Sequence, residues 1–356
     1  MAKTVLRPVR RVAMLVAILA LASCAADRPY NGPITVPFTS AFAMLDSREL
    51  EEPTPPIGQL SHTLRAGPDH LLFADHILRR ILLYDEDGTL QGSFGRAGDD
   101  PGGFRSLSGV GMGPDGRLLL SDNGKARLTF LHPDLEPDTA MQVGAVIGTL
   151  VGTAGGYVAD VYASRDGDRL QLLDANGRLG RSFMPLPPAT QENPYWSSFA
   201  WVRVAVVGSE IVASDGLTYP IRIFDAQGDS VGVLASPPPS FEPIPVVAAG
   251  AFSGMPGESL NRFVESFTTI GYLVSLDDKY LVVVHGRMHQ ALSQSFDMKH
   301  ESIDVYDLAS RRKILEDIRV PEGALVLAGG SSLVMLMTSP PEPWRVETFE
   351  LTLPVQ

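Results

Sequence analysis

Four aspartates end apolar runs at matching places along the chain. They are Asp75, Asp122, Asp160 and Asp215. Where such runs lie side by side, the four carboxylates share one face, and their oxygens could hold Ca²⁺ or another cation. An aspartate at a strand end also accepts hydrogen bonds from the amides of its own turn, and we favour this structural role. His285 and Thr338 occupy the equivalent positions later in the chain, which argues against a symmetric ion site.

A second group that could bind metal is a cluster of histidines. Three of the seven histidines, namely His285, His289 and His300, fall within one short segment. A helix over Gly286 to Ser295 would place His285 and His289 one turn apart, where they could ligate Zn²⁺ or another transition metal. No HExxH order accompanies them, so we favour a surface loop that is rich in histidine.

Aromatic and cationic residues form a third group, with the chemistry of recognition. Tyr195 and Trp196 follow an Asn-Pro pair and precede an apolar run that contains Arg203, and Arg287 lies beside the histidines. Aromatic faces and guanidinium groups can stack on a sugar ring or clamp a peptide. We predict that these four residues form a binding rim, whereas Trp201 is expected to pack between structural elements.

A phrase that returns about six times supplies the elements that must position these residues. Its clearest copy, Gly113 to Asp122, is a turn followed by an apolar run that ends in a polar residue. Apolar runs of this length between Asp-Gly and Pro-Asp turns are strands. Such repeats cannot bury their faces alone and stack radially as blades. We therefore predict an all-β fold over residues 34–356, a six-bladed β-propeller of four-stranded antiparallel blades, although five or seven blades would also accommodate the repeats.

The order of strands in a propeller predicts which segments meet. Loops between second and third strands share a face with the loops that join blades, so the four aspartates should ring one mouth of the central channel. Two insertions, 236–267 and 286–301, should emerge at the same mouth, and long loops of this kind commonly bind ligands. Ile34 to Leu45 is a candidate for the outermost strand of the last blade, because closing the ring with both chain ends removes a free sheet edge.

The N-terminal segment predicts export. Lys3, Arg7, Arg10 and Arg11 precede the apolar run Val12 to Leu21, which is too short to span a bilayer. We expect residues 1–23 to be a signal peptide.

The end of this segment carries a resemblance. Leu21-Ala22-Ser23-Cys24 resembles the lipobox of bacterial lipoproteins, which implies cleavage before Cys24 and attachment of diacylglycerol to its sulfur. Cys24 is the only cysteine, so no disulfide can form within the chain. Residues 24–33 would then be a lipidated tether, and Ala25 after the cysteine matches the Gram-negative pattern for the outer membrane. The alternative is an ordinary signal peptide with an accidental cysteine.

The second repeat resembles a known module. Phe94-Gly95-Arg96, Pro101-Gly102-Gly103-Phe104, Gly109-Val110 and the phrase from Pro114 to Asp122 are similar to an NHL repeat, which builds six-bladed propellers. The resemblance is close in one blade and partial in two others. Proteins of this fold include binding scaffolds, lyases and lactonases, so the resemblance implies a fold and leaves the activity open.

Charge and missing motifs narrow the function. The formal net charge is -12, and loss of the four cationic signal residues would take it to -16, which excludes binding to nucleic acid. GxSxG, P-loop, dinucleotide and CxxC motifs are absent from the sequence. We predict a lipid-anchored envelope protein of the Gram-negative outer membrane. Its propeller would be a non-enzymatic scaffold, without a cofactor, for a peptide, glycan or partner protein. The alternative is a metal-dependent hydrolase or lyase with Ca²⁺ or Zn²⁺ at the channel mouth.

Overall fold

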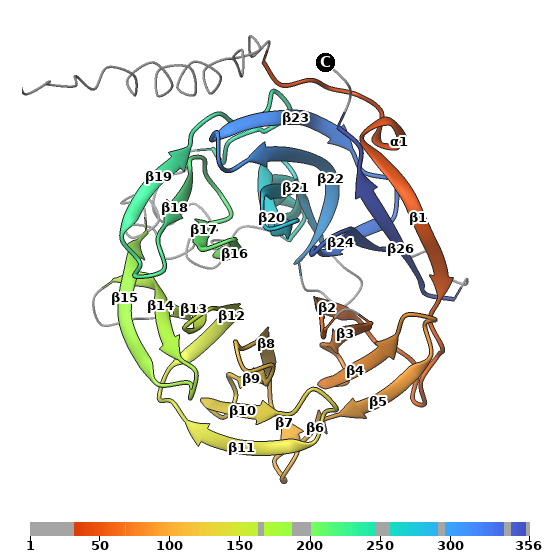
Figure 1. The fold of residues 1–356 in the computed structure, drawn as a ribbon, viewed down its shortest axis with the longest axis vertical. Coiled ribbons are helices and arrows are strands. Elements are labelled where there is room, and N and C mark those ends of the chain that lie inside the picture. The colour runs from red at the N-terminus through yellow and green to blue at the C-terminus, as the bar shows by residue number, and fades with distance from the viewer. Residues whose placement is uncertain are drawn as a thin grey trace, which may run out of the picture. The chain divides into compact units, whose positions relative to one another are not determined.

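Six four-stranded antiparallel sheets surround a common centre, as predicted (Figure 1). The computed structural model describes residues 32–67, 69–162, 167–186, 201–245, 257–290, 296–337 and 343–353. The chain divides into two units, residues 1–33 and residues 34–356, and the propeller is the second. Over the described ranges, the helices are too short or too polar to traverse a bilayer.

Each blade runs from an innermost to an outermost strand. Blade one has β2 (Leu60–Arg65), β3 (His70–Asp75), β4 (Arg80–Asp85) and β5 (Leu90–Phe94). Blade two has β8 (Leu107–Met112), β9 (Leu118–Asp122), β10 (Arg127–Leu131) and β11 (Pro137–Gln142). Blade three has β12 (Val146–Thr153), β13 (Gly156–Tyr162), β14 (Asp168–Asp174) and β15 (Leu179–Pro185). Between blades one and two, β6 (Arg96–Ala97) pairs with β7 (Gly103–Phe104).

The second half of the chain repeats this order. Blade four has β16 (Arg203–Val207), β17 (Glu210–Ser214), β18 (Ile221–Phe224) and β19 (Ser230–Leu234). Blade five has β20 (Thr268–Leu276), β21 (Tyr280–Gln290), β22 (Phe296–Asp307) and β23 (Arg312–Arg319). Blade six has β24 (Ala324–Ala328), β25 (Leu333–Met337), β26 (Arg345–Leu351) and, outermost, β1 (Phe42–Glu49).

Both ends of the propeller unit close the ring together. Strand β1 pairs antiparallel with β26, from Phe42 opposite Leu351 to Glu49 opposite Arg345. The prediction that the N-terminal segment supplies the outermost strand is confirmed, but the strand starts later than expected. Residues 38–41 form the short helix α1 (Phe38–Ala41) instead. The Phe38 ring packs against the rings of Phe42 and Phe349, so the turn of helix is held by apolar contacts beside the last blade.

The hydrophobic core lies between neighbouring blades. One cluster, for example, combines Leu72 and Ile81 of blade one with Val110 and Leu118 of blade two, all buried. Because each blade buries both faces, its middle strands are continuous apolar runs. Near the channel the innermost strands approach closely, and a Cβ on Gly109 would overlap the carbonyl oxygen of Gly148 in the next blade. This is a position where only glycine fits.

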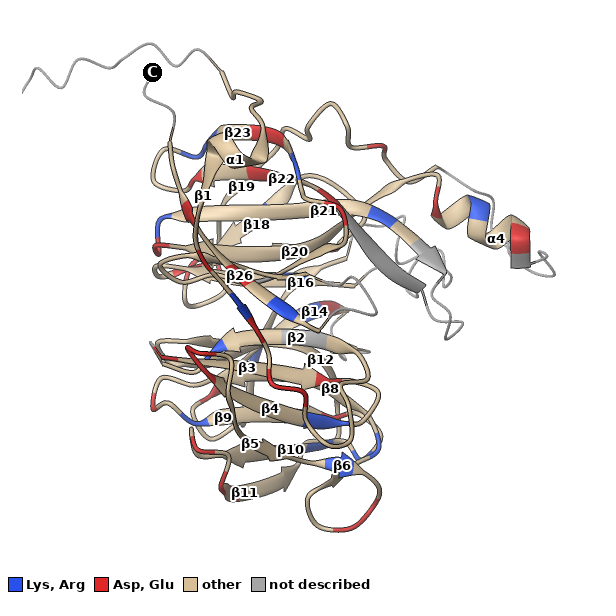
Figure 2. Cartoon of the chain, turned by 90° about the vertical axis from the view of Figure 1, so that its right-hand side faces the viewer, with Lys and Arg blue, Asp and Glu red and all other residues tan. Residues whose placement is uncertain are grey.

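The irregular fifth blade departs from the sequence prediction. Instead of a separate loop or helix after residue 285, β21 continues to Gln290 and β22 begins at Phe296, so the two strands extend beyond the sheet. The preceding insertion contributes helix α4 (Gly257–Val264), which contacts β21. Figure 2 shows α4 and the end of β21 projecting on the same side of the propeller. Val264, Phe267, Met288, Leu217 and Ile244 form a small separate core beneath them.

Candidate functional site

The aspartate that ends β3 makes its hydrogen bonds within its own blade. Asp75 is fully buried, and its carboxylate accepts the amides of Gly58 (3.1 Å), Gln59 (3.2 Å) and Leu78 (3.2 Å). Arg80 donates its Nε at 3.2 Å to the same group. Gly58 and Gln59 lead into the innermost strand, so one carboxylate joins the start of β2 to the end of β3.

Two further aspartates have comparable roles. Asp122 accepts the amides of Arg105 (3.1 Å) and Ser106 (2.9 Å), which lead into β8 as Gly58 and Gln59 lead into β2. Asp215 accepts the amides of Leu217 (2.9 Å) and Thr218 (2.8 Å) and the Thr218 hydroxyl (2.8 Å). These contacts support the structural interpretation of the repeated aspartates and leave metal ligation by them without support.

Asp160 is different, because it pairs with an arginine instead of a turn. It lies buried in β13, and Arg169 of β14 donates Nε to one carboxylate oxygen at 2.9 Å and Nη2 to the other at 2.8 Å. Burial raises the pKa of Asp160 to about 6, while the charges of Arg169 and Arg203 act in the opposite direction. The Arg169 guanidinium also lies over the Tyr162 ring at 4.3 Å.

Arg203, a predicted rim residue, lies at the start of β16 between two aromatic rings. Its guanidinium carbon is 5.5 Å from the Trp201 ring centroid and 5.5 Å from that of Tyr272. Its Nε is buried and has no hydrogen-bond partner, and over the described ranges its other nitrogens make no hydrogen bond or ion pair. Burial lowers the pKa of Arg203, whereas Tyr272, Tyr162 and Asp160 oppose this. The result is a cation flanked by two aromatic rings, whose Nε donates to no described residue.

Arg287, the other described rim residue, is partly exposed. It lies in β21 opposite Thr268 and donates its Nη2 to Glu242 at 2.9 Å, with the side chains 41% and 56% exposed. A solvent-exposed ion pair of this kind contributes only about 0–1 kcal/mol to stability. Glu242 belongs to the segment that precedes α4, so the pair links that segment to the extended β21.

The described part of the chain covers the remaining predicted residues only in part. Cys24, Tyr195 and Trp196 lie outside the described residues. His289 and His300 lie in β21 and β22, where only the backbone is described, opposite Asp297 and Gly286 respectively. The helix that would place His285 and His289 one turn apart is wrong for residues 286–290. In a strand, the Cα atoms of His285 and His289 are about 13 Å apart, more than twice the rise of one helical turn.

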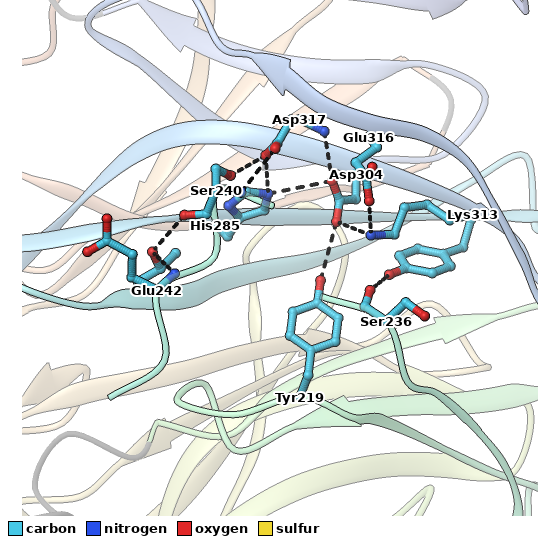
Figure 3. Close-up of polar contacts among 11 residues, drawn as sticks. Tyr219, Ser236, Ser240, Glu242, His285, Asp304, Lys313, Glu316 and Asp317 are labelled. Atoms are coloured by element: carbon cyan, nitrogen blue, oxygen red, sulfur yellow. Dashed lines mark hydrogen bonds and ion pairs between the residues drawn. The ribbon is translucent and has the colours of Figure 1, made fainter. Parts of the chain in front are cut away.

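The structure instead brings His285 beside two acids that the sequence analysis did not select. Its Nε2 lies 3.6 Å from Asp304 Oδ1 of β22 and 3.9 Å from Asp317 Oδ1 of β23 (Figure 3). His285 and Asp304 are buried, and Asp317 is partly buried. One signal in the sequence was available: Asp304 interrupts an otherwise apolar stretch, Ile303 to Val305, in the interior of a strand.

More polar groups surround these three residues. Asp304 Oδ2 lies 3.3 Å from Lys313 Nζ and accepts the Tyr219 hydroxyl at 3.4 Å. Lys313 also donates to Glu316 at 2.7 Å. Burial, and next the charge of Asp304, raise the pKa of Tyr219 well above its ordinary value, so that hydroxyl keeps its proton. Asp317 accepts both the amide (3.1 Å) and the hydroxyl of Ser240, which precedes Glu242 in the same segment.

Comparison with known proteins supports the fold. No family model matches the sequence, and no curated protein does. Among solved structures, one is of a Bacteroides fragilis protein that is described as exported by inference. It has a TM-score of 0.64 at 10% sequence identity, and the match covers 90% of this chain and 98% of that chain. A DUF4221 family member from Bacteroides vulgatus gives 0.62 at 10% identity, covering 88% and 99%. The protein U3-55K gives 0.51 at 14% identity, covering 86% and 98%. At these identities the likeness extends to the fold alone.

Proposed function

We propose that this protein is an exported lipoprotein, anchored in the outer membrane through Cys24, whose propeller is a non-enzymatic scaffold that binds a peptide, glycan or partner protein. The signal-like N-terminus and the cysteine motif motivate the anchor. A similar fold in a Bacteroides protein with an inferred export assignment is consistent with export. The observation that carries the binding role is Arg203.

Arg203 has the chemistry of a recognition residue. A guanidinium presents a planar set of donors that matches a carboxylate in two parallel hydrogen bonds. Here its Nε donates to no described residue, and the rings of Trp201 and Tyr272 flank the guanidinium group. Aromatic rings also offer stacking surfaces for a sugar or a peptide side chain. A ligand with a carboxylate would fit this combination.

The surrounding segments suit a binding mouth. The segment with Glu242, helix α4 and the extended β21 lie together, with Trp201 packed against the small core beneath α4. The predicted rim residues Tyr195 and Trp196 precede β16, which begins with Arg203. Binding sites commonly sit on loops that a rigid scaffold positions.

The alternative, a metal-dependent hydrolase or lyase at the channel mouth, has less support. In the described part of the chain, one group of side chains has the spacing of metal ligands, namely His285, Asp304 and Asp317. His285 and Asp304 are 1% and 0% exposed. A catalytic metal needs a coordination position that substrate can reach. A buried site of this kind suits a structural metal ion better than a catalytic one.

The test is a binding screen with matched variants. Full-length protein in detergent is applied to arrays of peptides and glycans that either carry or lack a carboxylate, and the variants Arg203→Ala and Arg178→Ala are compared. Arg178 is exposed in the turn before β15, at the opposite end of blade three from Asp160. We expect carboxylate-bearing ligands to bind wild type and Arg178→Ala, with at least tenfold weaker binding by Arg203→Ala. Ligands held equally by all three proteins would refute the role of Arg203.

A further inference from the structure

A buried imidazole nitrogen faces two carboxylates without a hydrogen bond. His285 is 1% exposed, and its Nε2 has no hydrogen-bond partner. The two nearest carboxylate oxygens, on Asp304 and Asp317, lie 3.6 Å and 3.9 Å away, beyond the length of a hydrogen bond. If Nε2 is protonated, its donor is unused; if it is not, its lone pair faces two negative oxygens. Neither form satisfies the group.

The distances from His285 Nε2 to the two carboxylate oxygens are close to those between ligand atoms of one metal ion. Zinc binds imidazole nitrogen at about 2.0–2.1 Å and carboxylate oxygen at about 2.0–2.2 Å, so tetrahedral ligands lie about 3.4 Å apart. The two separations from His285 Nε2 exceed this by about 0.2 and 0.5 Å. All three ligand atoms lie within 4.8 Å of one another.

The local charges also require a cation. Asp304, Asp317 and Glu316 carry three negative charges, and Lys313 supplies one positive charge through contacts of 3.3 Å to Asp304 and 2.7 Å to Glu316. Asp304 is fully buried, with Lys313 and the Tyr219 hydroxyl at Oδ2 and the amide of Asp317 donating to Oδ1 at 3.0 Å, so the excess negative charge of the group lies on Asp317 and Glu316, where partial burial makes it costly. A divalent cation beside neutral His285 would balance the group.

We propose that His285, Asp304 and Asp317 bind one divalent transition-metal ion, of which Zn²⁺ is the expected occupant. Imidazole ligands favour zinc and similar ions over Ca²⁺ and Mg²⁺, which prefer oxygen ligands alone. The three ligands come from β21, β22 and β23, so the ion ties the three outer strands of blade five together. Its role is structural, and it does not depend on ligand binding at Arg203.

The ion also reaches the segment before α4. Asp317 accepts the amide and hydroxyl of Ser240, and the Phe241 ring lies against His285 at 6.3 Å and against Tyr219 at 5.0 Å. A metal that fixes Asp317 and His285 therefore also fixes residues 240–242, which carry the exposed Glu242–Arg287 pair. We expect metal removal to loosen this segment while the ring of blades persists.

The test starts with metal content. Full-length protein in detergent is stripped with a chelator, dialysed, and titrated with Zn²⁺, Mn²⁺ or Ca²⁺. We expect one Zn²⁺ per chain and, at zinc one hundred times its dissociation constant, a rise in Tm of about 4 °C. X-ray absorption at the zinc edge should show nitrogen and oxygen ligands without sulfur, which excludes Cys24. Zinc should also slow proteolysis within residues 236–245.

Variants assign the site. His285→Gln and Asp317→Asn should lose the bound zinc and the Tm rise, whereas His132→Gln, which removes an exposed histidine of blade two, should retain both. Wild-type protein that binds no zinc, binds only Ca²⁺, or shows no zinc-dependent Tm rise would overturn the proposal whether or not the variants fold. Retention of stoichiometric zinc by a folded Asp317→Asn or His285→Gln protein would also overturn it.

Discussion

Replacing Asp75 by alanine should be among the most damaging single changes to this propeller. The carboxylate accepts three backbone amides and the Nε of Arg80, and it is fully buried. Alanine leaves all four donors without that acceptor. Arg80, whose side chain is 7% exposed, keeps the carbonyls of Pro55 and Pro56 as partners but loses its counter-charge.

The size of the effect follows from this burial. Removing one member of a buried charged pair costs about 3–5 kcal/mol, because the remaining charge is left uncompensated. For a domain of this size, an unfolding entropy of about 2.1 cal/mol/K per residue amounts to roughly 0.7 kcal/mol/K. The expected fall in Tm is therefore about 4–7 °C, provided that unfolding is close to two-state.

Asp85 provides a matched control in the same blade. It ends β4 as Asp75 ends β3, and it accepts the amides of Asp87 (3.0 Å) and Thr89 (2.9 Å), but these contacts are exposed to solvent. Asp85→Ala should lower Tm by no more than about 2 °C, since solvent replaces the lost contacts. The assay is thermal unfolding followed by circular dichroism, with and without chelator, and the two variants are compared in its presence. Equal effects of the two variants would refute the structural interpretation of Asp75, and chelator sensitivity of wild type that Asp75→Ala abolishes would favour a metal at that position.

Two further predictions concern other sites. Burial raises the pKa of Asp160 to about 6, whereas its value in the unfolded chain is near 3.9. Between about pH 4 and pH 6 the native state therefore keeps a proton that the unfolded state releases. The contribution of Asp160 to stability falls as pH rises through this range, by up to about 3 kcal/mol. Urea unfolding from pH 4 to pH 7 should show that the stability of wild type relative to Asp160→Asn declines over this range, and a constant or rising difference would mean that Arg169 keeps the carboxylate ionised. Cys24→Ser should abolish incorporation of labelled palmitate and move the protein from the detergent phase to the aqueous phase, because the chain has no second cysteine to accept lipid; unchanged labelling would contradict the anchor.

The repeated turns made the architecture predictable, whereas the irregular blade was less so. Asp-Gly and Pro-Asp turns bound short apolar runs, and β9 ends at Asp122, where the clearest copy of the repeated phrase ends, because local turns fix both of its neighbours in the sheet. The limits of an outermost strand such as β11 are not readable from the sequence, because its mostly exposed residues have no apolar pattern. The extension of β21 to Gln290 was also missed, because it depends on pairing with β22 across residues that are distant from any turn signal.

The candidate sites were less predictable than the fold, because they too depend on contacts between distant parts of the chain. Arg203 and His285 could be selected by residue type, but their environments depend on partners from other strands and blades. Tyr272 lies in β20 of the next blade, and Asp317 lies in β23 with a φ of 53°, where the chain departs from regular strand geometry. No spacing rule within one repeat connects such positions. The single chemical clue, an acid inside an apolar strand at Asp304, marks a residue that needs a partner without saying which one.

Buried charged side chains differ in whether their polar atoms have hydrogen-bond partners, and this difference separates residues with a structural role from candidates for binding. Leaving a buried donor or acceptor without a partner costs about 1–3 kcal/mol, so such groups persist where something else binds them. Among the described charged side chains with such an atom, Arg65 and Arg127 bind Ser332 and Gly103 through another nitrogen. Arg287 similarly binds Glu242.

Arg203 and His285 lack that compensation. Arg203 has two flanking aromatic rings and the opposing charge of Asp160, but its Nε donates to no described residue. His285 Nε2 faces two carboxylates that are too distant for hydrogen bonds. Arg203 lies at the start of the innermost strand β16, where Asp160 and two aromatic rings act on it, and the proposed ligand would bind there. His285 is enclosed by strands and by the segment at Ser240, so only a small ion fits. The same criterion thus supports the proposed ligand at the first residue and the proposed metal at the second.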